Sequence, residues 1–277
     1  MKVSTTTETI TPAMAESWLE KNKENRPVRD DHVAMLAREM AEGRWKLNGE
    51  AIVFDYDGNL LDGQHRLWAS YDHRLSFDSV VVRGVEPAAF STIDSGMKRA
   101  AGDVLVKAGY GYGTLMASAV RIVHFYETGA SNNQIIKRMS NGATLELVRK
   151  YPRVEKATAL IGPLKRQRRI VAPSAMAALC YYTLEVGEPQ TKDFIDAITT
   201  GADLGRKDAR LIARNYLINQ RQAGNRITAR TQFALLIKAW NAYIEGRDVG
   251  VLKFLDSEEY PVFLHRQKKP LTRKRAA

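Results

Sequence analysis

Apolar residues near the start of the chain recur at helical spacing. A Thr-Pro pair precedes residues 13–22, which is typical of a capped helix with proline in its first turn. The apolar residues within 33–40 follow an i, i+3, i+4, i+7 pattern, which predicts a second amphipathic helix. We expect Asp30 or Asp31 to cap this helix and Gly43 to end it.

The pattern then changes to short β-rich runs. Residues 51–55 are followed by an Asp57-Gly58 pair, a frequent hairpin turn. Leu60-Leu61 predicts a second short strand, and the Val-rich run within 77–83 predicts a buried one. Helical segments are expected between and after these strands, at 65–71 and 87–92. The first part of the chain is therefore predicted to be mixed α/β.

From residue 113 onward the pattern is almost wholly helical, and Gly and Pro separate the predicted helices. These helices are expected at 115–126, 132–139, 144–151, 174–185, 191–199, 207–222 and 228–245. The predicted fold class is α+β, a small mixed α/β domain followed by an all-α domain. We expect the domains at 10–106 and 107–250, with a basic C-terminal tail at 251–277.

Composition agrees with a folded protein: of 277 residues, 44% are hydrophobic and 26% charged. No apolar run approaches the roughly 18 residues of a membrane span, and the N-terminus lacks the apolar core of a secretory signal. We therefore expect a cytoplasmic protein without membrane contact. Cys180 is the single cysteine, which excludes an internal disulfide and a cysteine-based metal site.

Charge is divided unevenly along the chain. Residues 1–105 hold 13 Lys and Arg against 17 Asp and Glu, a formal charge of −4. Residues 106–277 hold 29 against 14, a formal charge of +15. A strongly basic domain attracts polyanions, so DNA is the expected partner of the second part. The run of Lys165, Arg166, Arg168 and Arg169 is the candidate DNA contact, because such side chains bind phosphates.

The turn at 62–66, Asp-Gly-Gln-His-Arg, carries the most specific chemistry. It is predicted to join the end of a strand to the start of a helix, where unpaired backbone N–H groups and the helix dipole favour anions. Gly63 permits positive φ and close approach of a ligand. His65 and Arg66 can add hydrogen bonds to phosphate oxygens. On physical grounds alone, a plain structural connection fits this pattern equally well.

The sequence Asp62-Gly63-Gln64-His65-Arg66-Leu67-x-Ala69 resembles the Gly-x-x-Arg-x-x-Ala phosphate box of the ParB/sulfiredoxin superfamily. It is close to the "DGQHR" form found in phage and bacterial proteins. The order of the flanking segments is also similar. Asn25-Arg26-Pro27-Val28-Arg29 precedes a predicted helix, and Val81-Val82-Arg83 is followed by the polar segment 93–99. The resemblance covers about residues 10–105.

This resemblance implies a nucleotide site. A nucleoside triphosphate, CTP or ATP, would bind through Gly63, Gln64, His65, Arg66, Asn25, Arg26, Lys98 and Arg99. Asp94 is the candidate catalytic carboxylate and could hold Mg²⁺. The second polar motif lacks the Glu-Asn pair of the family, so the base preference stays open. Gln64 stands where sulfiredoxin has its cysteine, which excludes repair of sulfinic acids.

The expected function is that of a nucleotide-binding, DNA-binding protein of ParB-like type, in which hydrolysis of the triphosphate is open. Two alternatives remain from the sequence. One is a ParB-like nuclease or phosphoryl-transfer enzyme that acts on DNA or nucleotides. The other is a non-catalytic interaction protein on the same fold. The sequence also leaves open whether the chain forms a homodimer.

Overall fold

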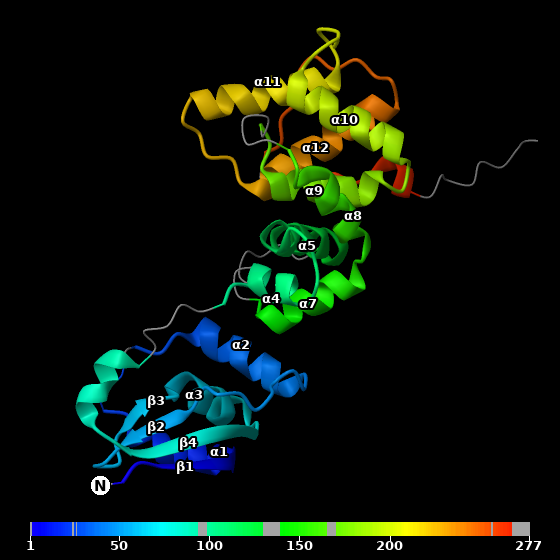
Figure 1. Ribbon diagram of the computed structural model, residues 1–277. Coiled ribbons are helices and arrows are strands. Elements are labelled where there is room, and N and C mark those ends of the chain that lie inside the picture. Colours follow the sequence, from blue (N-terminus) through cyan, green and yellow to red (C-terminus); the bar gives the residue numbers. More distant parts are fainter. Residues whose placement is uncertain are drawn as a thin grey trace, which may run out of the picture. The chain divides into compact units, whose positions relative to one another are not determined.

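The computed structural model describes residues 2–23, 25, 27–93, 99–129, 139–164, 170–255 and 257–267. The chain divides into two compact units (Figure 1). The first, here the sheet unit, comprises Met1–Arg99 and Asn132–Gly142. The second, here the helical unit, comprises Ala100–Ser131 and Ala143–Ala277. The described residues thus form a mixed α/β protein.

Four strands form the sheet of the first unit, in the order β1-β4-β2-β3. They are β1 (Ser4–Ile10), β2 (Ile52–Asp55), β3 (Leu60–Asp62) and β4 (Phe77–Val85). β2 and β4 are parallel, whereas β1 pairs with β4 and β3 with β2 in antiparallel fashion. A parallel pair needs a crossover connection, and the β3–helix segment between β2 and β4 supplies it. Both carboxyl ends of the parallel pair therefore meet at one edge of the sheet.

The helices of this unit are α1 (Pro12–Leu19), α2 (Asp30–Ala41), α3 (Gln64–His73) and the 3₁₀ helix η1 (Pro87–Thr92). α3 lies between α2 and the sheet (Figure 1). Its Leu67 packs in the sheet core with Ile52 and Val81, while its Ala69 packs against Val33 of α2. Because α3 is buried on both sides, the turn that begins it is held firmly in place.

Two local predictions for this unit were wrong. Strand β1 was not predicted, since its sequence Ser-Thr-Thr-Thr-Glu-Thr-Ile offers no apolar alternation; its β-branched threonines suit an edge strand instead. The sheet unit consequently begins well before residue 10. Asp30 and Asp31 lie inside the first turn of α2, and Arg29 occupies the cap position. Acidic residues in a first turn still favour the helix through its dipole.

Among the residues that the structure describes, the helical unit has helices and connecting loops but no strand. The helices are α4 (Ala101–Lys107), α5 (Gly113–Thr128), α7 (Asn141–Lys150), α8 (Arg153–Ile161), α9 (Pro173–Thr183), α10 (Glu188–Thr200), α11 (Ala209–Gln222), α12 (Ala229–Ile244) and η3 (Leu264–Arg266). Helix α7 begins in two residues of the sheet unit. Helix α8 was not predicted, and the predicted helix at 132–139 lies mostly outside the described residues.

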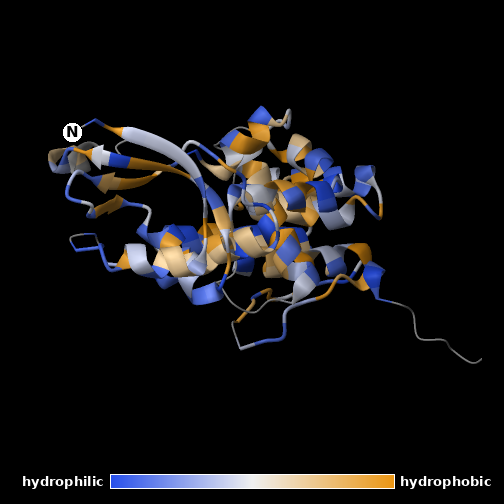
Figure 2. Cartoon of the chain, turned by 90° about the horizontal axis from the view of Figure 1, so that it is seen from below, coloured by the Kyte–Doolittle hydropathy of each residue, from blue (hydrophilic) through white to orange (hydrophobic). Residues whose placement is uncertain are grey.

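Helix α9 forms the centre of the helical unit and packs against α5, α8, α10 and α12. Eight of its eleven residues are buried, including Cys180, whose thiol pKa is raised by burial. Figure 2 shows apolar residues concentrated where the helices pack and hydrophilic residues on their outer sides. This helical unit therefore has a core of its own, formed by residues far apart in sequence.

The segment after α12 is not a free tail over its described length. Leu252, Phe254 and Phe263 are buried, and the backbone N–H of Phe263 donates to the Tyr126 hydroxyl at 3.1 Å. The prediction placed residues 251–277 in a basic tail, but 251–255 and 257–267 pack on the helical unit through these apolar side chains. Residues 268–277 lie outside the described residues. None of the described helices is long and apolar enough to cross a membrane.

Candidate functional site

The turn before α3 has the backbone geometry that only glycine tolerates well. Gly63 has φ +106° and ψ −1° and occupies the cap position of α3. A Cβ on Gly63 would lie 2.9 Å from Cγ1 of Ile52, so the turn packs directly on β2. The carbonyl oxygen of Gly63 accepts hydrogen bonds from the N–H groups of Arg66, at 3.0 Å, and Leu67, at 3.1 Å. Both close backbone approach and positive φ therefore require glycine here.

Arg66 points its guanidinium into the protein. Its Nη1 donates to the carbonyl oxygen of Glu50 at 2.5 Å. Its Nη2 donates to the carbonyl oxygen of Ala51 at 2.8 Å and to Oδ2 of Asp62 at 3.0 Å. The side chain thus ties the start of α3 to the chain entering β2 and balances its charge with a carboxylate. In this conformation the Arg66 guanidinium, which was predicted to bind phosphate, donates to main-chain carbonyl oxygens instead.

A polar segment lies across the same turn. Asn22 donates through Nδ2 to Oε1 of Gln64 at 3.0 Å. Asn25 donates through Nδ2 to Oδ1 of Asn22 and to the carbonyl oxygen of Leu60, each at 2.7 Å. The structure therefore brings Asn25 and Gln64, both predicted site residues, into one hydrogen-bonded group. Their amides orient one another and fix the path of the chain over the turn.

The segment is fastened again at its far end by His65. Nε2 of His65 accepts the backbone N–H of Arg29 at 3.2 Å. The rings of His65 and His32 meet edge to face, with centroids 5.1 Å apart. Since Nε2 is an acceptor, the neutral imidazole carries its proton on Nδ1. His65 thereby couples the turn to the first residues of α2.

These contacts leave the predicted phosphate cradle covered. Gln64, His65 and Arg66 are only 4%, 7% and 6% exposed. Arg29 by contrast is exposed, although its backbone is held against the turn. Arg29 belongs to the Asn-Arg-Pro loop motif but was not among the predicted site residues. Its place in the same loop motif as Asn25 and Arg26 was the available indication.

Several predicted site residues lie outside the residues that the structure describes. These are Arg26, Asp94, Lys98, Lys165, Arg166, Arg168 and Arg169. Arg99 is described and is exposed. Its carbonyl oxygen accepts a hydrogen bond from Nδ2 of Asn141 at 3.0 Å, so the contact seen for Arg99 is not with the turn.

A second feature of this unit, the sheet-end hollow, was missed by the sequence analysis. It has a volume of about 310 Å³ and lies where the carboxyl ends of β2 and β4 meet. Arg83 stacks over the rings of Trp18 and Phe54, and Lys21 lies 5.9 Å from the Phe54 centroid. The Arg83 guanidinium also bonds Glu8 and holds the pKa of that carboxyl below its usual value. Ligands of open α/β sheets often bind at such an edge.

Among the described residues, no group of three or more His, Cys, Asp or Glu side chains is placed to hold a metal ion. Comparison with protein-family models, with curated proteins and with solved structures found no match. The resemblance to the ParB/sulfiredoxin superfamily therefore depends on the motif and on the order of elements around it.

Proposed function

We propose that the sheet unit binds a nucleoside triphosphate, with its phosphates at the Gly63 turn, and that the helical unit binds DNA, as in a ParB-like protein. One observation carries the nucleotide proposal. A left-handed Gly63 opens α3, and Asn22, Asn25 and the backbone N–H of Arg29 are hydrogen-bonded around that turn. Such a helix start favours an anion, and the segment above it offers polar side chains for recognition.

The charge balance of the turn supports Arg29 as the main cation of the proposed site. Arg66 is hydrogen-bonded to Asp62 and to two carbonyl oxygens, so its positive charge is largely neutralised by these acceptors. Arg29 is exposed and anchored at its backbone, 3.2 Å from His65. An arginine fork on a fixed backbone can bind two phosphate oxygens at once. We therefore add Arg29 to the proposed nucleotide-binding residues.

Because the turn is buried, phosphate binding requires a local change of structure. A phosphate can reach the first N–H groups of α3 only if the Asn22–Arg29 segment moves or parts from Gln64 and His65. The proposal thus links nucleotide binding to a rearrangement of this segment. Hydrogen exchange of residues 21–29 should change when nucleotide saturates the protein, whereas the exchange of β4 should not.

Calorimetric titration of CTP, ATP and GTP into the full chain, with and without Mg²⁺, tests the nucleotide proposal. We expect one of them to bind at one site per chain. Absence of binding by all three would overturn it. Mg²⁺ would arrive with the triphosphate, and Asp94 is the carboxylate proposed to meet it. Metal-dependent cleavage of DNA or nucleotide that is lost in Asp94→Ala would instead favour the enzymatic alternative.

The proposal of DNA binding depends on the charge of +15 on residues 106–277. Polyanion binding of this kind releases counterions, so affinity falls steeply with salt. Titrating duplex DNA at about 50 and about 200 mM salt should give at least ~10-fold weaker binding at the higher concentration. An affinity that does not change with salt would contradict this part of the proposal.

A further inference from the structure

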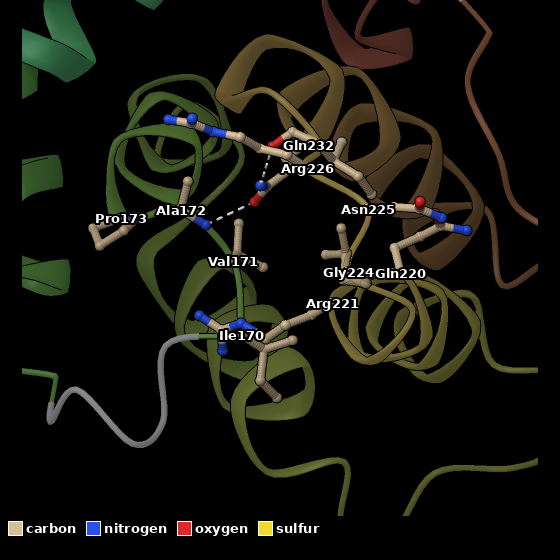
Figure 3. Close-up of a pocket in the computed structure, with 12 residues that line it drawn as sticks. Ile170, Val171, Ala172, Pro173, Gln220, Arg221, Gly224, Asn225, Arg226 and Gln232 are labelled. Atoms are coloured by element: carbon tan, nitrogen blue, oxygen red, sulfur yellow. Dashed lines mark hydrogen bonds between the residues drawn. The ribbon is translucent and has the colours of Figure 1, made fainter.

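A hollow of about 560 Å³ lies within the helical unit, between the chain that leads into α9 and the α11–α12 connection (Figure 3). Its size is within the range of small-molecule sites. Residues 170–173 form one wall, and the end of α11 with residues 224–227 forms the other. No carboxylate is among the described residues that line it. We call it the arginine hollow, after Arg221 and Arg226 at its rim.

The walls of the arginine hollow are tied together by one side chain. Oε1 of Gln232 accepts the backbone N–H of Ala172 at 2.7 Å, and Nε2 of Gln232 donates to the carbonyl oxygen of Ile227 at 3.0 Å. The α11–α12 connection is braced as well: Asn225 donates to Gln220 from its backbone at 2.9 Å and from Nδ2 at 2.8 Å. These hydrogen bonds hold both walls of the hollow in place.

Arg221 and Arg226 give the hollow a positive charge. Both are exposed, and in Figure 3 their side chains extend from the α11–α12 side toward the wall of residues 170–173, at different ends of the hollow. The rest of the lining is mixed: Gln220, Asn225 and Gln232 are polar, and of the apolar residues Ile170 is half-buried while Val171 and Leu217 are buried. Guanidinium groups bind phosphate oxygens, while an apolar surface accepts the flat face of an unstacked base. The combination fits one nucleotide.

We propose that the arginine hollow receives one nucleotide of a single-stranded nucleic acid, with the base against Ile170 and the flanking phosphates on Arg221 and Arg226. A base inside a duplex is stacked and cannot enter a hollow, so the site would favour single strands. This inference deepens the proposed binding of nucleic acid by the helical unit and depends on it. The run Lys165–Arg169, which directly precedes Ile170 in sequence, adds positive charge to the same stretch of chain.

Fluorescence anisotropy with a labelled 20-nucleotide single strand and a duplex of equal length tests this. We expect tighter binding of the single strand, and about fivefold weaker binding for Arg221→Ala and for Arg226→Ala. The log-affinity against log-salt slope should fall by about 0.7 for each arginine removed. Arg206→Ala is the matched control: Arg206 is exposed, carries the same charge and does not line the hollow.

A strand with abasic positions separates base binding from phosphate binding. It keeps every phosphate, so we expect it to bind more weakly only if a base occupies the hollow. Equal binding of abasic and intact strands, or equal losses for Arg206→Ala and Arg221→Ala, would overturn this inference while leaving the DNA proposal intact. Failure of the protein to bind either strand or duplex at low salt would overturn both.

Discussion

The backbone N–H of Arg29 donates to Nε2 of His65 across a distance of 3.2 Å. The bond joins two sequence motifs that are 36 residues apart, the Asn-Arg-Pro loop and the Asp-Gly-Gln-His-Arg turn. It places an exposed arginine at the edge of a helix start while the arginine of the turn itself points inward. In the proposed nucleotide site, Arg29 therefore takes the phosphate-binding role that the motif alone would give to Arg66.

Arg66→Lys should destabilise the sheet unit. A lysine ammonium cannot reproduce the fork that holds Glu50, Ala51 and Asp62, so three charge-assisted hydrogen bonds of a buried guanidinium would be lost in part, at a cost of about 2 kcal/mol. Urea unfolding followed by tryptophan fluorescence would measure this, because three of the four tryptophans lie in the sheet unit. Unchanged stability combined with lost nucleotide affinity would show that Arg66 acts as a phosphate ligand instead.

Gly63→Ala should lower stability by about 2 kcal/mol or more, from backbone strain at positive φ together with a contact on Ile52. Gly58→Ala provides the control in the same unit. Gly58 also has positive φ, +81°, but a Cβ there would meet no atom within 4 Å. Its loss should be about 1 kcal/mol. Equal losses in the two variants would mean that the contact with Ile52 is of no consequence.

The sequence predicted most of the sheet unit because its signals are local. Strands β2, β3 and β4 and helices α1, α2 and α3 follow from apolar spacing and turn residues. β1 depends on pairing with β4, 67 to 79 residues away in sequence, and its threonines look polar when read alone. Helix α8 likewise gains its stability by packing on α9.

The candidate site was predictable only in outline. The motif indicated that residues 62–66 form a strand-to-helix turn, and the structure places Asn25 beside it. The inward direction of Arg66 could not be read from the sequence, because it depends on two carbonyl oxygens that β2 brings into reach. The sheet-end and arginine hollows are also tertiary features: their lining residues come from segments without a shared motif.

Asp62→Asn should strengthen nucleotide binding about two- to fivefold, because the Asp62 carboxylate both repels a phosphate and occupies Arg66. The asparagine can still accept the hydrogen bond from Arg66, so the turn should keep its shape. Calorimetry on the variant and the parent chain would measure the ratio. Weaker binding in Asp62→Asn would argue against an anion at this turn.

His124 should make the helical unit less stable in mild acid. Burial, and then the charge of Lys150, lowers the pKa of His124, whose Nδ1 lies 3.4 Å from the Tyr151 hydroxyl. The folded protein therefore favours the neutral ring. Above about pH 6.5 the ring is neutral in the folded and in the unfolded state, and the stabilisation is complete. As pH falls through 6.5 toward the lower folded pKa, the unfolded state takes up more protons and stability is lost.

His124→Gln should remove this part of the pH dependence, as measured by urea unfolding at pH 5 and 7.5. An identical pH dependence in variant and parent would refute it.

The most direct test of the nucleotide site compares Arg29→Ala with Arg38→Ala by calorimetric titration with the triphosphate that the parent chain binds. Both arginines are exposed and belong to the start or body of α2, and both variants remove one positive charge. We predict at least ~10-fold weaker binding for Arg29→Ala, since it loses a charge-assisted phosphate contact, and nearly unchanged binding for Arg38→Ala. Equal affinities in the two variants, with a loss in Lys21→Ala, would contradict the assignment and move the ligand to the sheet-end hollow.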